Sequence, residues 1–489
     1  MARRRLTAAR GYEAARPGRL RDGWLYNSAS SNVTVAAAAE RLRNQARSLC
    51  ENNPYAAKFR RSWASNAVGD GIVASIMFPG QPQASSAGVE SAWSEWVEYC
   101  DAGDNMNLYA LQSMVAKSVP ESGECLVRKT MYRRRNGEKF RLRLQVLEPD
   151  YIDTYRNEDS RSGAGFIRRG LQYDSFGRKQ GYWLFQEHPG ESGYFGGRPP
   201  GIESVFVPSS DVCHVFTANR PGQERGISWF APVILRTYDA KDYEEAEIAR
   251  KRIEACLSVF IFGNGDYDIG SPANGYDQNG ELKREVVLEP GMVNHLPPGT
   301  DVKFTSPTAS DGYADFMSVQ LHAIAAGLGI SYEAMTGDVS QVNFSSLRYG
   351  NNEYRRLISE FRWHALIPQM CQKIFGWWSN EAEALGLMPA QPKMVEWRPP
   401  HFESLDRMKD AAADLTELRM GKKSLARVIG EDGYSWRETL REMAEVNAEL
   451  DRLGLKVDSD LREKGGASAP EARSRHMENI IRLASSKND

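Results

Sequence analysis

Two helical stretches enclose a short segment rich in turns, and this order restricts the possible fold more than any other feature of the sequence. The first stretch, 232–262, begins with a proline, which suits the first turn of a helix, and is densely charged with both signs. At 1.5 Å per residue, a helix of this length extends about 45 Å. The segment 263–307 contains turns and short strand patterns, and 311–328 is again helical. The sequence therefore predicts a helical hairpin that carries a small insertion.

A narrow apolar stripe runs along each helix of the hairpin. A long helix with such a stripe packs against neighbours along its length rather than around a globular core. In the second helix we predict that the stripe faces inward. The stripe residues are Ala246, Ala249, Ile253, Cys256 and Phe260 in the first helix, and Phe316, Val319, Ala323 and Ala326 in the second.

Helices and strands alternate before the hairpin. The residue patterns predict helices at 35–48, 54–63 and about 89–99. Strand patterns follow at 125–127, 142–147 and 182–185, the second with an alternation of apolar and polar residues. The N-terminal half is therefore expected to be mixed α/β.

The chain after the hairpin is mainly helical. A polar loop at 336–343 leads into a helix at 345–378, in which Gly350–Asn352 and Pro368 are expected to cause bends. The section beyond Trp397 is helical and charged. Together with the N-terminal half, this pattern predicts the fold class α+β.

The charge balance argues against tight, stationary binding of nucleic acid. The chain has 62 Lys and Arg against 64 Asp and Glu, a formal net charge of −2. A protein that grips DNA carries a basic excess, because neutralising phosphates releases counterions. Loose contact, in which DNA slides, stays open. Seven arginines lie within the first 21 residues, and we expect this arm to be either solvated or in contact with capsid or nucleic acid.

Motifs for catalysis, cofactors or metals are not indicated. The six cysteines are far apart, and no two of the seven histidines are four residues apart, so no cofactor or metal is expected. Gly421–Ser424 resembles the end of a phosphate loop but lacks the first glycine, so a turn between helices is expected there. Asn264–Asp268 lacks the glycine and the acid of a calcium loop. His214 is expected to be buried in a strand. No apolar run is long enough for a membrane span.

Several strings of the sequence resemble the lambda-like family of phage portal proteins. The strongest are RPGQERGIS at 220–228 and IAAGLGISYEAMTGDVSQVNFSSLR at 324–348. Weaker pieces occur in the expected order over about 40–455. They are Arg43 with Arg47, NNPYA at 52–56, VGDGI at 68–72, QVLEPD at 145–150, HPG at 188–190 and VCHVF at 212–216.

The resemblance implies a portal-protein fold and a ring of twelve copies. Its implied regions are a basic arm (1–34), a mixed α/β wing (35–226), a stem helix (227–262), a clip (263–309), a second stem helix (310–334), a tunnel loop (335–346), a kinked wing helix with a return strand (347–400), and a crown with a C-terminal tail (401–489). It also implies a structural protein of the virion vertex rather than an enzyme, present in the host cytoplasm during assembly.

The resemblance assigns roles to three sets of residues. The tunnel loop would line the DNA channel, the stem charges would face neighbouring copies, and the motif residues would be structural. The loop set is Asp338, Ser340, Gln341, Asn343 and Ser345; the stem set is Arg236, Asp239, Lys241, Glu244, Glu245, Glu247, Arg250 and Arg252; the motif set is Arg220, Pro221, Gly222, Gln223, Arg225, Gly226, Gly329, Gly337 and Arg348.

The partners implied are other copies of the chain, double-stranded DNA, the terminase large subunit, head-completion or neck proteins, and the major capsid and scaffold proteins. The loop at 335–346 contains no Lys or Arg, which suits a channel in which DNA must slide. Two other interpretations remain open. One is another phage connector or capsid-associated protein, and the other is a hydrolytic enzyme with dispersed catalytic residues.

Overall fold

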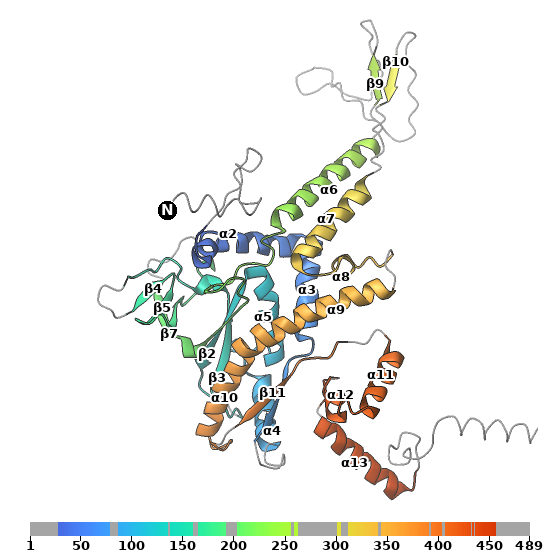
Figure 1. Cartoon of the computed structure of the whole chain (residues 1–489). Coiled ribbons are helices and arrows are strands. Elements are labelled where there is room, and N and C mark those ends of the chain that lie inside the picture. The colour runs from blue at the N-terminus through green and yellow to red at the C-terminus, as the bar shows by residue number, and fades with distance from the viewer. Residues whose placement is uncertain are drawn as a thin grey trace, which may run out of the picture. The chain divides into compact units, whose positions relative to one another are not determined.

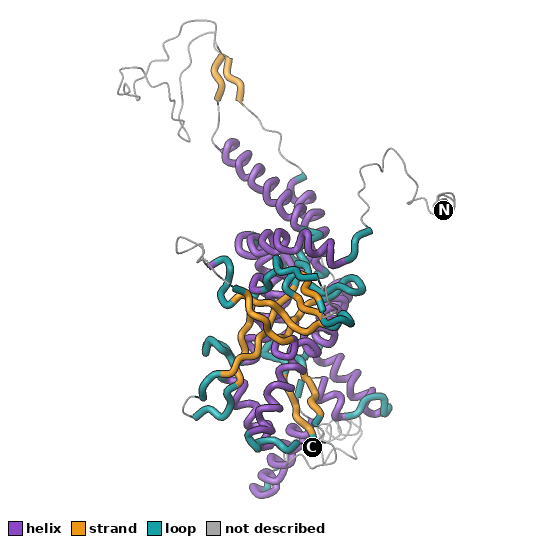
Figure 2. Tube along the Cα trace, turned by 90° about the vertical axis from the view of Figure 1, so that its left-hand side faces the viewer, coloured by secondary structure: helices purple, strands orange, loops and turns teal. Residues whose placement is uncertain are grey.

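The computed structural model describes residues 28–78, 87–134, 137–159, 165–191, 203–255, 259–262, 301–304, 312–340, 344–390, 393–402, 406–431, 433–434 and 436–455. The chain forms two compact units. The first comprises Met1–Gly71 and Ile76–Val395, and the second comprises Ile72–Ser75 and Glu396–Asp489. Figures 1 and 2 show an α+β protein, as the sequence predicts.

Four helices form the helical layer of the N-terminal part of the first unit. Asn53 ends the first of them and caps the next, since its side chain accepts hydrogen bonds from the backbone N–H groups of Tyr55 and Ala56, and Pro54 occupies the first turn. The four helices are α2 (Ser31–Asn52), α3 (Pro54–Val68), α4 (Ala87–Glu98) and α5 (Leu108–Ser122). The first three were predicted from the sequence and are confirmed, whereas α5 was not predicted.

Two antiparallel sheets share one apolar core. The first has the strand order β3-β2-β8 and the second the order β4-β5-β6-β7. Leu126, Leu147 and Val212 of the first sheet pack with Tyr182 and Leu184 of the second. The predicted strands are confirmed. The strands are β2 (Glu124–Met131), β3 (Leu142–Leu147), β4 (Phe166–Arg168), β5 (Leu171–Tyr173), β6 (Lys179–Phe185), β7 (Ser204–Pro208) and β8 (Val212–Phe216), with single 3-10 turns at Pro149–Tyr151 and Ser209–Asp211.

The predicted helical hairpin is formed by α6 (Ile234–Ala255) and α7 (Tyr313–Leu328), which lie side by side in Figures 1 and 2. The first helix is shorter than predicted. Val259–Phe262 form strand β9 instead and pair with β10 (Asp301–Phe304) in antiparallel register. Aromatic and β-branched side chains favour this extended pairing over a continued helix. Residues 263–300, most of the predicted insertion, lie outside the described residues.

The predicted inward face of the second hairpin helix is not the buried face of the single chain, although Phe316 packs against α6 and Ala323 is half-buried. Val319 is 63% exposed and Phe316 is 40% exposed, and Ala326 is also exposed. The buried side of α7 carries Met317, Leu321, Ile324, Ala325 and Leu328 instead. In α6 the stripe residues Ala246 and Ala249 are likewise exposed, while the side chains of Ile253, Cys256 and Phe260 lie outside the described set.

The short helix α8 (Tyr332–Thr336) follows the hairpin. After the segment 337–343 comes a continuous helical run, which consists of α9 (Phe344–Phe361), a π-helical segment (Arg362–Cys371) and α10 (Gln372–Ala384). At Pro368, where a bend is predicted, the helix adopts π-helical turns, because proline lacks an N–H and its ring clashes with the carbonyl four residues earlier. Gly350–Asn352 stay within α9 without interruption.

The described part of the second unit contains three helices, α11 (Arg407–Arg419), α12 (Leu425–Glu431) and α13 (Trp436–Leu453). None of their described residues is buried. The predicted turn between helices at Gly421–Ser424 is confirmed. Lys423 in this turn contacts Asp414 at 2.9 Å and Glu431 at 2.9 Å.

Strand β1 (Val73–Met77) pairs with β11 (Met394–Arg398). Within the described parts of the chain, no helix has the length and apolar character of a membrane span.

Candidate functional site

The hairpin of α6 and α7 is the first candidate site. Its two helices are joined at one level by Arg236, whose Nη1 donates to Gln320 Oε1 at 3.0 Å. Further along, Tyr243 packs against Tyr313 and Phe316, with ring centroids 5.9 and 4.4 Å apart. A Cβ on Gly327 would lie 2.3 Å from Val233 Cγ1, so the glycine permits the close approach at the hairpin base.

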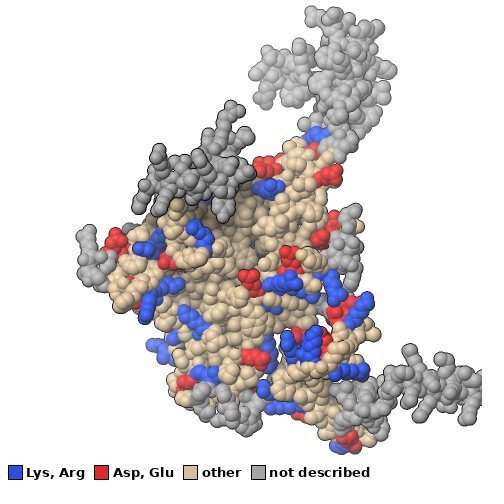
Figure 3. All heavy atoms as spheres, in the orientation of Figure 1, with Lys and Arg blue, Asp and Glu red and all other residues tan. Residues whose placement is uncertain are grey.

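The predicted stem charges lie along α6, and the pairs that they form are local. Lys241 Nζ lies 3.5 Å from Glu245, and Arg250 Nη2 lies 2.6 Å from Glu247. Asp239 and Arg252 are exposed, and Glu244 is half-buried. In Figure 3, Lys and Arg side chains are interspersed with Asp and Glu over the face shown. The contact of these charges with neighbouring copies stays a prediction.

In the predicted channel loop at 335–346, the first two residues belong to α8, and Gly337 ends this helix in the left-handed conformation with φ of 82°. Asp338 and Ser340 are exposed. Asp338 Oδ1 accepts a hydrogen bond from the backbone N–H of Ser340 at 2.9 Å, and contacts from Ser340 lower the pKa of the Asp338 carboxyl. Gln341 and Asn343 lie outside the described residues, as does the side chain of Ser345 in α9.

A cation from another element lies at the base of this loop. Lys58 Nζ on α3 is 2.8 Å from the position that a Cβ on Gly337 would take. The loop itself contains no Lys or Arg. Lys58 is 279 positions away from Gly337 in the chain, so the loop sequence did not predict this neighbour. No pattern in the sequence reveals it.

The motif at 220–226 encloses a buried ion pair. Glu124, the first residue of β2, accepts hydrogen bonds from Arg225 Nε at 2.8 and 2.9 Å and from the backbone N–H of Gly226 at 2.8 Å. His214 Nε2 on β8 lies 2.8 Å from Glu124 Oε2. The Glu124 side chain is 1% exposed. One carboxylate thus joins two strands to the segment that leads into the hairpin.

Burial and charge set the protonation states of this cluster. Burial raises the pKa of the Glu124 carboxyl, but the charge of Arg225 and the hydrogen bond from His214 more than offset it, so the pKa lies below its usual range. Burial lowers the pKa of His214 to about 4, and its interactions with Glu124 only partly oppose this. The imidazole is therefore neutral at pH 7. The prediction that His214 is buried in a strand is confirmed.

The remaining motif residues lie in turns or at helix ends, except Arg348, which lies in α9. The Gln223 side chain accepts a hydrogen bond from the backbone N–H of Asn219 at 2.9 Å and donates to the Arg225 carbonyl at 2.8 Å. Gly226 has no room for a side chain, since its Cβ would lie 2.0 Å from the Gly123 carbonyl oxygen. The backbone has positive φ at Gly222, Gly329 and Gly337. Pro221 and Arg348 are exposed. Arg220 Nη2 donates a hydrogen bond to the Ala29 carbonyl at 3.4 Å.

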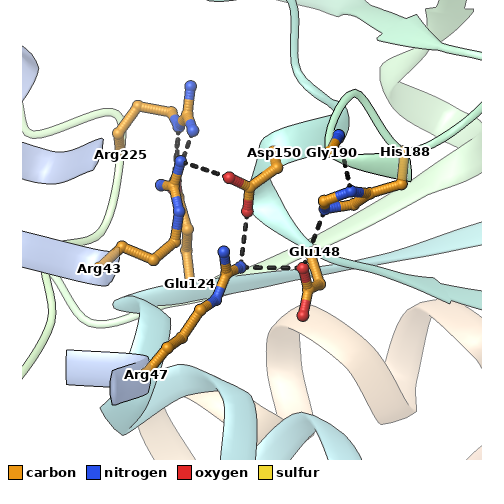
Figure 4. Close-up of polar contacts among 8 residues, drawn as sticks. All are labelled: Arg43, Arg47, Glu124, Glu148, Asp150, His188, Gly190 and Arg225. Atoms are coloured by element: carbon orange, nitrogen blue, oxygen red, sulfur yellow. Dashed lines mark hydrogen bonds and ion pairs between the residues drawn. The ribbon is translucent and has the colours of Figure 1, made fainter. Parts of the chain in front are cut away.

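A second polar cluster adjoins the first (Figure 4). Asp150 contacts Arg43 Nη2 at 3.0 Å and Arg47 Nη2 at 2.6 Å, and Arg47 also contacts Glu148 at 3.0 Å. His188 Nδ1 accepts from the backbone N–H of Gly190 at 3.1 Å, so Nε2 donates to Glu148. Burial raises the pKa of Asp150, but Arg43 and Arg47 reverse this and leave it lowered.

Metal binding is not favoured at this cluster. Glu148, Asp150 and His188 present ligand atoms within 4.8 Å of one another. The guanidinium of Arg47 already bridges the two carboxylates, and a cation would have to displace it.

Five cysteines are buried, and burial raises the pKa of Cys213 to about 12, so its thiol is neutral at pH 7.

Comparison with known proteins identifies the class of the chain, which is that of phage portal proteins. The chain belongs to the lambda family of this class, because residues 17–362 match the family described as "Phage portal protein, lambda family". The prediction of the family from the sequence is confirmed.

Two phage proteins are similar to this chain over most of its length. The probable portal protein of Halomonas phage phiHAP-1 is 24% identical over 93% of this chain and 89% of its own length. Portal protein B of Escherichia phage lambda is 24% identical over 88% of each chain. Among solved structures, a chain from the virion of a native gene transfer agent particle aligns at 16% identity with a TM-score of 0.46, over 87% of this chain and 98% of that chain.

Proposed function

We propose that this portal protein forms a ring of twelve copies at one capsid vertex, through which double-stranded DNA enters during packaging and leaves at ejection. The single observation that carries this proposal is the exposed hairpin with paired strands at its end. Two long helices with apolar stripes that stay exposed in one chain are suited to line up beside copies of themselves.

Each region then has a role in the ring. The body at 35–226 is the wing, and 227–262 with 310–334 is the stem. The insertion at 263–309 is the clip, where the terminase large subunit and then the head-completion or neck proteins dock. Residues 347–400 form the kinked wing helix and return strand, and 401–489 form the crown and tail. The body also meets the major capsid and scaffold proteins, and assembly takes place in the host cytoplasm.

The loop at 335–346 lines the channel in this proposal. Fixed Lys or Arg contacts with phosphate would create electrostatic barriers to sliding. The described part of the loop offers Asp338 and Ser340 to the solvent. The stem charges on α6, Arg236 to Arg252, lie at contacts between copies.

The mass and shape of the purified protein test the proposal. Twelve copies of the 54.8 kDa chain amount to about 660 kDa. Light scattering should give this mass, and electron microscopy along the axis should show a ring with a central hole wide enough for a DNA duplex. A protein that remains a single copy in solution and is absent from particle vertices would overturn it. A small oligomer that loses a hydrolytic activity on replacement of its carboxylates would favour an enzyme instead.

A further inference from the structure

A histidine side chain closes the turn that follows β6. Nδ1 of His188 accepts a hydrogen bond from the backbone N–H of Gly190 at 3.1 Å, and the His188 carbonyl accepts one from the Glu191 N–H at 3.0 Å. A Cβ on Gly190 would lie 3.0 Å from Nδ1, so the glycine lets the backbone come this close to the ring. Asparagine closes turns in the same way, because its side-chain oxygen accepts from the N–H two residues later.

The two ring nitrogens of His188 have different partners (Figure 4). Because Nδ1 accepts a hydrogen bond, it carries no proton, and the single ring proton of the neutral imidazole is on Nε2. Nε2 lies 3.1 Å from Glu148 Oε2 and donates to it. The turn is therefore closed by the neutral form of the ring.

Protonation of the ring removes the acceptor. An imidazolium carries N–H groups at both nitrogens and accepts no hydrogen bond. The new Nδ1 proton would point at the Gly190 N–H, so two donors would oppose each other where one hydrogen bond now forms. The ring and the backbone must then separate. Histidine side chains are the groups that ordinarily change charge between pH 5 and 8.

The charges on the other side of the ring keep His188 in place when it is protonated. Glu148 contacts Nε2, which carries a proton in both forms of the ring. Glu148 is held in turn by Arg47 of α2 at 3.0 Å, and Arg47 contacts Asp150 at 2.6 Å. Protonation therefore breaks the bond to Gly190 and leaves the bond to Glu148.

Three further titratable side chains lie near the ring, and none of them replaces Gly190 as the partner of Nδ1. The ring of Tyr151 packs edge-on against the imidazole, with centroids 5.4 Å apart. Glu187 and Glu191 are exposed on the same segment as His188. Among the described residues, the Gly190 N–H is the group that forms a hydrogen bond with Nδ1.

Solvent reaches this ring without unfolding of the chain. The His188 side chain is 28% exposed, whereas that of His214 is 3% exposed. His188 can therefore take up a proton directly from water, and the effect of acid on the turn is local.

We propose that His188 makes the turn His188–Glu191 acid-sensitive: the neutral ring holds the turn closed, and the protonated ring opens it. The opening frees the chain that leaves β6, while Arg47 keeps its contacts with Glu148 and Asp150. The inference does not depend on the proposed ring of twelve copies, because every group involved belongs to one chain.

Hydrogen exchange of the Gly190 amide tests the inference. Rapid mixing, followed by mass spectrometry with fragmentation to single residues, gives the exchange rate of this amide at pH 8 and pH 5. Protection is the ratio of the intrinsic rate to the observed rate at each pH, which removes the direct effect of pH on exchange. It should fall by about fivefold or more at pH 5, the factor that one solvent-accessible hydrogen bond contributes.

Two variants of His188 separate its two contacts. His188→Asn keeps an acceptor for the Gly190 N–H but does not titrate, so protection should be high and equal at both pH values. His188→Gln has a longer side chain that reaches Glu148 but not the Gly190 N–H, so protection should be low at both. His214 titrates alike in all three proteins, so differences between them arise at position 188.

Three results would overturn the inference. The first is equal protection of Gly190 at pH 8 and pH 5 in the unchanged protein. The second is a fall in His188→Asn as large as that in the unchanged protein, since the titrating group would then lie elsewhere. The third is high protection in His188→Gln, because the turn would then close without an acceptor at the Nδ1 position.

Discussion

The buried carboxylate of Glu124 accepts hydrogen bonds from three separate donors, and its side chain is 1% exposed. Arg225, Gly226 and His214 all direct hydrogen bonds to its carboxylate. An ion pair of this kind is costly to bury, but removing one partner is costlier, because the other charge then stays buried alone. The carboxylate therefore fixes the 220–226 turn to the sheet rather than merely adding a contact.

Glu124→Gln should destabilise the protein by about 3 to 5 kcal/mol, because Arg225 would be left without its counter-charge. Chemical denaturation monitored by circular dichroism measures the change. Glu121→Gln is the matched control, since Glu121 pairs with Arg60 at 2.7 Å nearer the surface. It should cost about 1 kcal/mol or less. Similar losses in the two variants would contradict the role of the buried carboxylate.

Acidification should destabilise the folded chain through His214. Its pKa is about 4 in the fold and about 6.5 when unfolded, so the unfolded state binds more protons between these values. The stability is fully present above pH 6.5 and is lost as the pH falls toward 4, by up to about 3 kcal/mol. Denaturation at pH 7 and pH 5 measures it. His214→Gln, which keeps a donor but does not titrate, should flatten this dependence; an unchanged slope would refute the assignment.

The sequence predicted the importance of 220–226 but not its partner. Glu124 is 101 positions from Arg225, and a lone glutamate at the start of a strand has no pattern that distinguishes it. The burial of His214 could be predicted, because it lies within the apolar string VCHVF. Its unpaired Nδ1 could not, since that depends on the packing around the ring.

At the scale of elements, the π-helical segment positions a buried arginine against another helix. Arg362 is 3% exposed, and its guanidinium donates to the Ala67 carbonyl at 2.8 Å and to the Asn66 carbonyl at 2.8 Å. These carbonyls belong to the last turn of α3, whose final C=O groups have no partner within the helix. The arginine therefore acts as a C-terminal cap supplied by a distant element.

Arg362→Met should destabilise the protein by about 3 kcal/mol, since two carbonyls lose a charged donor while the apolar stem is kept. Thermal unfolding measures the loss. Arg356→Met, at an exposed position of α9, should change stability by no more than about 0.5 kcal/mol. Equal effects at the two positions would show that Arg362 does not cap α3.

The loop after α8 offers a prediction about DNA movement. Asp338→Lys would add one cation per copy beside Lys58 and should reduce DNA-filled particles by about tenfold at low salt, less at high salt where phosphates are screened. Counting filled particles and rings by electron microscopy measures both effects. Asp338→Asn, which keeps an acceptor for the Ser340 N–H, should pack DNA normally. Unchanged packaging by the lysine variant would remove this loop from the channel.

The elements that the sequence misjudged have physical reasons. The spacing of apolar residues predicted a stripe on α7 that faces the inside of the single chain. The inside is occupied by Met317 and Leu321 instead. The predicted helix extended to residue 262, whereas α6 ends at Ala255. The prediction was too long because the apolar residues Val259–Phe262 fit a strand equally well. Helix α5 was not predicted, although its buried residues Leu108, Leu111, Val115 and Val119 have helical spacing and Pro120 lies only near its end.

At the scale of the molecule, the described helices of the second unit differ from the sheets of the first in how little apolar surface they bury. Its charged helical character was predicted, but only a structure shows that no described residue of α11–α13 is buried. Helices in a globular protein gain most of their stability from packing, so these helices open more readily than the sheets.

Hydrogen exchange of the single-copy protein should show this difference. Amide protons of α11–α13 should exchange at least about 100-fold faster than those of β2 and β3, because opening α11–α13 exposes little buried apolar surface. Mass spectrometry of peptides from the two regions measures it. Comparable protection in both regions would indicate that the second unit is stabilised as strongly as the first.

The attachment of the hairpin to the body has a mechanical consequence. The chain runs from Gly226–Trp229 through the buried Phe230 and Val233 into α6, which begins at Ile234. Before these residues, the Gly226 N–H donates to Glu124, and the Trp229 N–H donates to the Pro120 carbonyl at 2.9 Å. A force applied at the far end of the two helices would be transmitted along them to the buried apolar residues at the start of α6. It would then reach these polar bonds and, through Glu124, the central strand β2.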